Sequence, residues 1–201
     1  AKTDLQNQGA VTGSQSVNLK SDTGSITNQA DVEAKDGDVT MDAKADLQNQ
    51  GAVTGSQDVE LTSGQSMTND KAVMAGGNLT MDAGTTLTNS GALTAANGAV
   101  SLTSQKELLN QGAVQAGTSV TMGAKTDLHN QGVVKASQDA ELTSGGSMAN
   151  EQAVTAGRNL KMKAGTMLTN SGGLTATNGS IELTAQKELL NQGAVQAGTT
   201  V

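Results

Sequence analysis

The amino-acid sequence predicts an all-β protein: a right-handed parallel β-helix (solenoid) of about ten coils, with three short strands in each coil. Three observations predict this fold. An asparagine recurs every 20 or 21 residues, apolar and polar residues alternate between these asparagines, and the corners carry turn-forming residues. Self-similarity at such a period is typical of architectures in which each unit stacks on the previous one.

The asparagines define the repeating unit. Two residues before each asparagine stands Leu, Ile or Met, and four residues after it stands Val or Leu. Counted from the first of these apolar residues, the coils begin near residues 5, 26, 47, 67, 87, 108, 128, 148, 168 and 189. The asparagines are Asn7, Asn28, Asn49, Asn69, Asn89, Asn110, Asn130, Asn150, Asn170 and Asn191.

A longer repeat is superimposed on the short one. The stretch "LLNQGAVQAG" at Leu108–Gly117 recurs letter for letter at Leu189–Gly198, 81 residues later. The whole segment Asp46–Val120 aligns without gaps on Asp127–Val201 at about 70% identity. Four units have therefore been duplicated together.

The strands follow from the alternation of apolar residues with a period of two, as in Leu93-x-Ala95 and Val100-x-Leu102. This period indicates short strands with one buried face, and the corners between them are too short for a helix. Three units carry an extra residue at the corners Lys35–Gly37, Ala96–Gly98 and Thr177–Gly179, where turn chemistry accommodates it. Parallel stacking at about 4.8 Å per coil gives a rod about 45–50 Å long, right-handed by the usual crossover preference.

The predicted interior is narrow and aliphatic, and the asparagine column is its main polar component. Leu, Val, Ala and six methionines fill the inward positions. The methionines are Met41, Met67, Met81, Met122, Met148 and Met162. Because a buried amide without partners costs about 1–3 kcal/mol, we expect the asparagines to hydrogen-bond from coil to coil as a structural ladder rather than to hold a ligand.

Two other repeat folds fit the sequence less well. A leucine-rich repeat needs an L-x-x-L-x-L core, and no such pattern occurs. An ice-binding β-helix needs a regular threonine array, but Glu33, Met74 and Lys135 interrupt the outward column that contains Thr12 and Thr54.

Composition excludes several classes of function. Leu, Ile and Val make up only about 17% of the chain, but their regular placement argues against disorder. The net charge of −7 and the absence of aromatic residues argue against nucleic-acid binding, because neither clustered positive charge nor stacking is available. There is no cysteine, and no apolar run is long enough to cross a bilayer.

No constellation of residues predicts catalysis, a cofactor or a metal site. Acidic residues are spread over outward positions and corners, and the single histidine, His129, is expected to be solvated. The "KELLN" corner at Lys106–Asn110 is expected to be an ordinary corner with a Lys–Glu pair, and Leu109 to point outward beside it. One local basic cluster, Arg158, Lys161 and Lys163, is a weak candidate for binding an anionic glycan, although a solvated face is the simpler interpretation.

The segment "LTNSGALTAANGAVSLTSQKELLNQGAVQAGTSVTM" at Leu87–Met122 resembles the haemagglutinin repeat of filamentous haemagglutinin and related two-partner secretion exoproteins, including contact-dependent growth inhibition proteins. The resemblance covers essentially all 201 residues, and Asp31, Lys71 and Gln152 depart from the small residue expected at their corners.

The resemblance implies a secreted protein of the bacterial cell surface, exported through an outer-membrane two-partner transporter. Residues 1–201 are then expected to be a single β-helical segment of a longer rod that presents an adhesive or toxic tip. The alternative is a direct binding surface for a host or target-cell receptor or glycan, and a polysaccharide-active β-helix enzyme is a remote third. We expect the segment to be monomeric, with strand edges at its ends open to end-to-end contacts.

Overall fold

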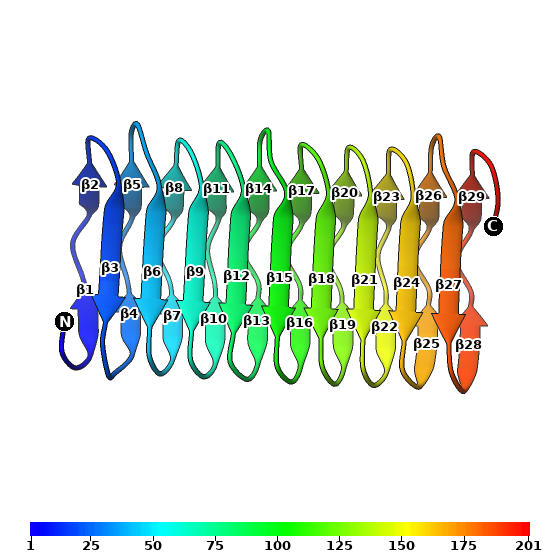
Figure 1. Cartoon of the computed structure of the whole chain (residues 1–201), viewed down its shortest axis with the longest axis horizontal. Coiled ribbons are helices and arrows are strands. Elements are labelled where there is room, and N and C mark those ends of the chain that lie inside the picture. Colours follow the sequence, from blue (N-terminus) through cyan, green and yellow to red (C-terminus); the bar gives the residue numbers. More distant parts are fainter.

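The computed structural model describes residues 1–201 and contains strands but no helix. The chain winds into a regular solenoid whose coils advance along one axis from the N-terminal to the C-terminal end (Figure 1). Each complete coil contributes one strand to each of three parallel sheets, as the sequence predicted. The strands of the front sheet run downward and those behind run upward while the coils advance, which makes the solenoid right-handed (Figure 1).

Sheet 1 contains the strands that end in the repeated asparagine. Its ten strands, in spatial order, are β1 (Leu5–Asn7), β4 (Ile26–Asn28), β7 (Leu47–Asn49), β10 (Met67–Asn69), β13 (Leu87–Asn89), β16 (Leu108–Asn110), β19 (Leu128–Asn130), β22 (Met148–Asn150), β25 (Met167–Asn170) and β28 (Glu188–Asn191). Asparagine lies on asparagine in every pairing, for example Asn89 on Asn110 and Asn110 on Asn130.

Sheet 2 follows sheet 1 after a short bend in each coil. Its ten strands are β2 (Val11–Gly13), β5 (Val32–Ala34), β8 (Val53–Gly55), β11 (Val73–Ala75), β14 (Leu93–Ala95), β17 (Val114–Ala116), β20 (Val134–Ala136), β23 (Val154–Ala156), β26 (Leu174–Ala176) and β29 (Val195–Ala197). The small final residue of each strand is the Gly or Ala that recurs in the sequence.

Sheet 3 has longer strands and faces the other two sheets (Figure 1). Its nine strands are β3 (Val17–Ser21), β6 (Val39–Ala43), β9 (Val59–Ser63), β12 (Leu79–Ala83), β15 (Val100–Ser104), β18 (Val120–Ala124), β21 (Ala140–Ser144), β24 (Leu160–Ala164) and β27 (Ile181–Ala185). The cross-section is therefore flat, because one five-residue strand lies opposite two three-residue strands in most coils.

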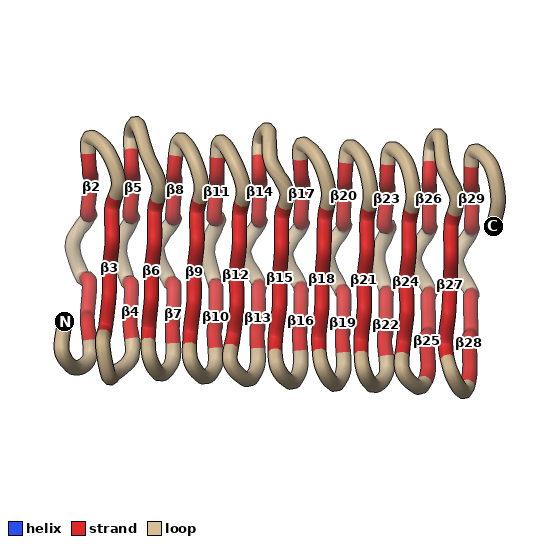
Figure 2. The backbone as a smooth tube through the Cα atoms, in the orientation of Figure 1, coloured by secondary structure: helices blue, strands red, loops and turns tan.

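The corners absorb every difference in coil length. The loops after β5, β14 and β26 rise above their neighbours (Figure 2), and they hold the three predicted extra residues. A fourth extra residue, which was not assigned to a corner from the sequence, lies between β3 and β4. The strands keep one register throughout, so insertions at corners leave the buried columns aligned.

The core is one continuous cluster of 43 buried apolar residues along the axis. All six methionines predicted to point inward are buried, whereas Met74 and Met167 are exposed. A single coil cannot bury its apolar face, so this core exists only because the coils stack. No helix of the chain is long and apolar enough to cross a membrane.

Candidate functional site

The asparagine side chains form a continuous hydrogen-bonded ladder through the interior. Each Nδ2 donates to the Oδ1 of the asparagine in the following coil, at distances of 2.6 to 2.8 Å. The ladder joins Asn7, Asn28, Asn49, Asn69, Asn89, Asn110, Asn130, Asn150, Asn170 and Asn191. All nine bonds point from the N-terminal toward the C-terminal coil.

The second Nδ2 hydrogen binds within its own coil. Asn110 donates 2.9 Å to the carbonyl oxygen of Gly112, two residues further on, and seven other asparagines make the same bond. No buried side-chain nitrogen or oxygen lacks a partner. The amides are thus occupied by the fold, and the ladder continues through the coils in which Lys71 and Gln152 replace glycine.

The glycine two residues after the asparagine permits close stacking. No glycine in the chain has a positive φ, so left-handed backbone geometry does not explain it. A Cβ atom on Gly112 would lie 1.9 Å from the carbonyl oxygen of Gly91 in the preceding coil. The side chain is therefore excluded because successive backbones approach each other closely at this corner.

Many acidic residues act as acceptors for backbone N–H groups of the next coil. Asp46 and Asp127 accept from Ser66 and Ser147, at 2.9 and 2.7 Å, at the corner that precedes sheet 1. At the corner that precedes sheet 3, Asp58 accepts from the N–H of Asn78 at 2.6 Å. These carboxylates tie neighbouring coils together, and no three His, Cys, Asp or Glu side chains gather as a metal-binding group.

The predicted basic cluster lies over β24 and the loop before it. Arg158 donates to Asp139 at 2.6 Å and to Gln138 at 2.8 Å, and Lys161 lies 3.7 Å from Glu141. The N–H of Asn159 and the Arg158 guanidinium lower the pKa of Asp139. Lys163 takes part in no salt bridge, so the cluster is partly neutralised by the preceding coil.

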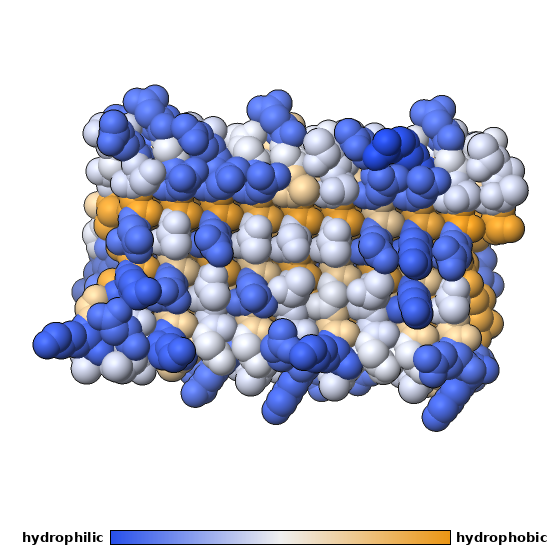
Figure 3. Space-filling model, viewed as in Figure 1, coloured by the Kyte–Doolittle hydropathy of each residue, from blue (hydrophilic) through white to orange (hydrophobic).

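The outward face of sheet 3 is not uniform (Figure 3). Hydrophilic side chains gather toward both ends of this face, and weakly polar ones lie between them (Figure 3). Thr80, Ser101 and Thr121 follow one another in the central strands β12, β15 and β18. Near one end, Lys20 donates to Asp42 at 2.8 Å, and this bond raises the pKa of Lys20.

His129 lies on the outward face of sheet 1 and is half-exposed. Its Nε2 atom lies 2.5 Å from Oε1 of Glu151, in the corner of the following coil. The hydrogen bonds from His129 and Gln131 lower the pKa of Glu151. The sequence placed His129 in solvent but did not indicate this partner, which is 22 residues away along the chain.

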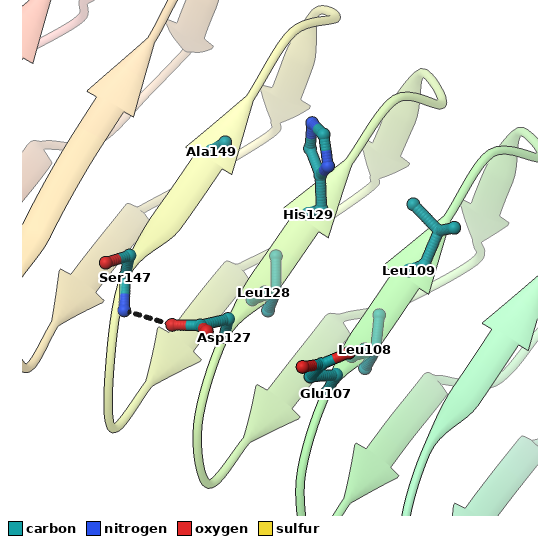
Figure 4. A pocket seen from close by; sticks show the side chains of 8 residues that line it. All are labelled: Glu107, Leu108, Leu109, Asp127, Leu128, His129, Ser147 and Ala149. Atoms are coloured by element: carbon teal, nitrogen blue, oxygen red, sulfur yellow. Dashed lines mark hydrogen bonds between the residues drawn. The ribbon is translucent and has the colours of Figure 1, made fainter. Parts of the chain in front are cut away.

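The "KELLN" corner differs in one respect from its sequence interpretation. Lys106 and Glu107 are both exposed and form no salt bridge, because consecutive residues around the corner do not face each other. Leu109 points away from the interior, as expected, and lines a shallow hollow together with His129 and Ala149 (Figure 4).

The haemagglutinin repeat family model matches this chain at residues 10–112, 75–161 and 149–201. These overlapping matches span almost the whole sequence, so the chain belongs to the haemagglutinin repeat family. This membership implies a secreted or surface-exposed protein, and the family is associated with two-partner secretion exoproteins. No curated protein matches the chain, and no solved structure matches it.

Proposed function

We propose that this chain is a structural rod segment of a large secreted bacterial surface exoprotein, part of a longer β-helix that holds an adhesive or toxic tip away from the cell. The observation that carries this proposal is the unbroken stacking of the coils. Three sheets and the asparagine ladder run through the whole segment in one register.

Rigidity follows from the way each coil is attached. A coil in the middle of the stack forms hydrogen bonds in all three sheets and in the ladder, on both of its sides. Bending the rod would stretch these bonds on one face and compress the core on another. A stack of this kind transmits length, at about 4.8 Å per coil, whatever side chains cover its surface.

Export through an outer-membrane two-partner transporter suits this architecture. Each coil pairs mainly with the coils before and after it, so a chain that emerges from its N-terminal end can fold coil by coil. No cysteine is present to form a disulfide before threading. The proposed location is the exterior of the outer membrane or the medium.

An in-register deletion tests the spacer role. Removing residues 47–127 joins Asp46 to Leu128, which reproduces the natural junction between Asp127 and Leu128. Because four coils are lost, small-angle scattering should show a folded rod shorter by about 19 Å. A control deletion of residues 47–117 joins Asp46 to Thr118, breaks the columns and should not fold. A four-coil deletion that unfolds, or that leaves the length unchanged, would contradict the proposal.

A second candidate function is direct binding of an anionic glycan by Arg158, Lys161 and Lys163. The observation in its favour is that these cations gather over one strand of an otherwise acidic chain. Binding of the chain to a sulfated-glycan array, abolished in Arg158→Glu with Lys161→Glu, would support this function. The spacer role alone predicts no saturable binding to the array.

A further inference from the structure

Sheet 1 carries a shallow, mostly apolar hollow on its outward face. Its volume is about 300 Å³, at the lower end of the range for small-molecule pockets. The residues that line it come from three consecutive coils (Figure 4). They are Glu107, Leu108, Leu109, Asp127, Leu128, His129, Ser147 and Ala149.

The hollow forms where the outward column of sheet 1 departs from its usual composition. This column holds Gln or Thr in all but four coils. Leu109, His129 and Ala149 stand side by side in β16, β19 and β22 and replace that polar surface. The short side chain of Ala149 leaves space beyond His129, and the side chain of Leu109 forms an apolar wall.

The rim of the hollow is acidic. Glu107 and Asp127 stand directly before β16 and β19, are exposed, and take part in no salt bridge. Asp127 uses Oδ1 to accept the N–H of Ser147 at 2.7 Å, and Glu107 makes no side-chain hydrogen bond (Figure 4). Each carboxylate therefore has at least one oxygen free to accept from a ligand.

We propose that this hollow is a docking site for a partner polypeptide that inserts a lysine or arginine side chain. The aliphatic stem of that side chain would pack on Leu109 and Ala149, and its cation would lie at Glu107 and Asp127. Lysine and arginine commonly bury their stems on apolar surface while the charged head stays in water. The hydrogen bond from His129 to Glu151 holds the wall between the two apolar residues in place.

The chemistry of the hollow favours this occupant over others. No aromatic residue is present in the chain, so a sugar ring finds no stacking partner. The acidic rim repels phosphate and sulfate groups. With a net charge of −7, two copies of this chain repel each other. A basic segment of another protein has both the complementary charge and the apolar stem.

Methyl-detected NMR titration of the 201-residue chain tests the site. The probe is acetyl-lysine methylamide, and the matched control is acetyl-norleucine methylamide, which has the same stem without the cation. The lysine probe should shift the methyl signals of Leu109 and Ala149 saturably, in the millimolar range. The norleucine probe should bind about fivefold more weakly, which is the contribution expected of exposed ion pairs.

Variants separate the apolar and the charged contributions. Ala149→Thr fills the hollow with the residue of neighbouring coils and should abolish the saturable shifts. Glu107→Gln with Asp127→Asn keeps an acceptor for Ser147 and should lower lysine-probe binding to the norleucine level. Thr68→Ala, at the equivalent position of the other duplicated copy, should create no binding there. The proposal is overturned by unsaturable shifts, by equal binding of the two probes, or by unchanged binding in Ala149→Thr.

Discussion

The two duplicated copies, Asp46–Val120 and Asp127–Val201, agree inside the solenoid and differ outside it. Only four inward positions differ between them. The pairs are Gly55 and Ala136, Val59 and Ala140, Val100 and Ile181, and Ser104 and Ala185. Each change exchanges one small or aliphatic residue for another, and every inward Leu, Met and Asn is retained. Stacking therefore limits the interior residues far more than the exterior ones.

Outward differences between the copies change charge and size freely. Thr80 and Asp82 of the first copy correspond to Lys161 and Lys163 of the second, and Gly77 corresponds to Arg158. The duplication thus shows how this fold acquires surface features: the register stays fixed while single outward residues are replaced. Both the basic cluster and the hollow use residues at which the second copy departs from the first.

The largest effect should follow from breaking the ladder, which both copies retain. Asn110→Leu removes the bonds to Asn130 and Gly112 and leaves the amide of Asn89 without its acceptor. At about 1–3 kcal/mol for each orphaned buried group, unfolding should cost about 4 kcal/mol less. The melting temperature should fall by several degrees, and Gln111→Ala, at the exposed neighbouring residue, should change it little. A melting curve of Asn110→Leu that matches the unmodified chain would show that the ladder is dispensable.

A pair of glycine substitutions sharpens the contrast between inward and outward positions. In Gly112→Ala the new Cβ meets the Gly91 carbonyl oxygen, so the variant should lose about 1–3 kcal/mol of stability. In Gly123→Ala the nearest atom is the Thr143 hydroxyl at 3.5 Å, an ordinary contact. That variant should be neutral or slightly more stable, because alanine suits a strand better than glycine. Urea denaturation compares the two, and equal losses would contradict the steric explanation.

Exchanging residues between the copies tests the comparison directly. Val59→Ala introduces the residue of the second copy at a buried position and should cost about 2 kcal/mol through lost packing. Thr80→Lys introduces the second copy's residue at an outward position beside Glu60 and should change stability by less than about 0.5 kcal/mol. Thermal denaturation measures both, and a larger loss in Thr80→Lys would reverse the interpretation of the two faces.

The smallest effect concerns pH. The pKa of Asp139 is lowered by the Asn159 N–H and by Arg158, so its contribution to stability is present above the pKa of an unfolded aspartate. That contribution is lost as the pH falls through the lower folded-state pKa. Arg158→Gly, which restores the first copy's residue, should raise the pKa of Asp139 toward its ordinary value. Carboxyl-carbon NMR titration measures the shift, and an unchanged value would assign the lowering to Asn159 alone.

The interior of this protein could be predicted from the sequence because stacking repeats the same local environment in every coil. Asn110 and Leu108 are each surrounded by copies of themselves, so a periodic pattern already specifies their neighbours. The four coil-length differences were partly predictable, since three of them coincide with turn motifs and the one between β3 and β4 does not.

The hollow and the pair between His129 and Glu151 could not be predicted in the same way. Each depends on outward residues from different coils, about 20 residues apart, that do not follow the repeat. Listing the outward column as a unit would have shown Leu109, His129 and Ala149 together, but their side-chain directions and the space between them depend on the twist of the sheet.

The single orientation of the amide bonds gives the rod two unlike faces at any cross-section. A cut between Asn89 and Asn110 exposes an N–H donor on one surface and a carbonyl acceptor on the other. Two broken pieces can therefore rejoin through this column only donor to acceptor, so that both keep the same sense along the axis. Opposed pieces would bring two donors or two acceptors together, and the solenoid in this way excludes joints that reverse its direction.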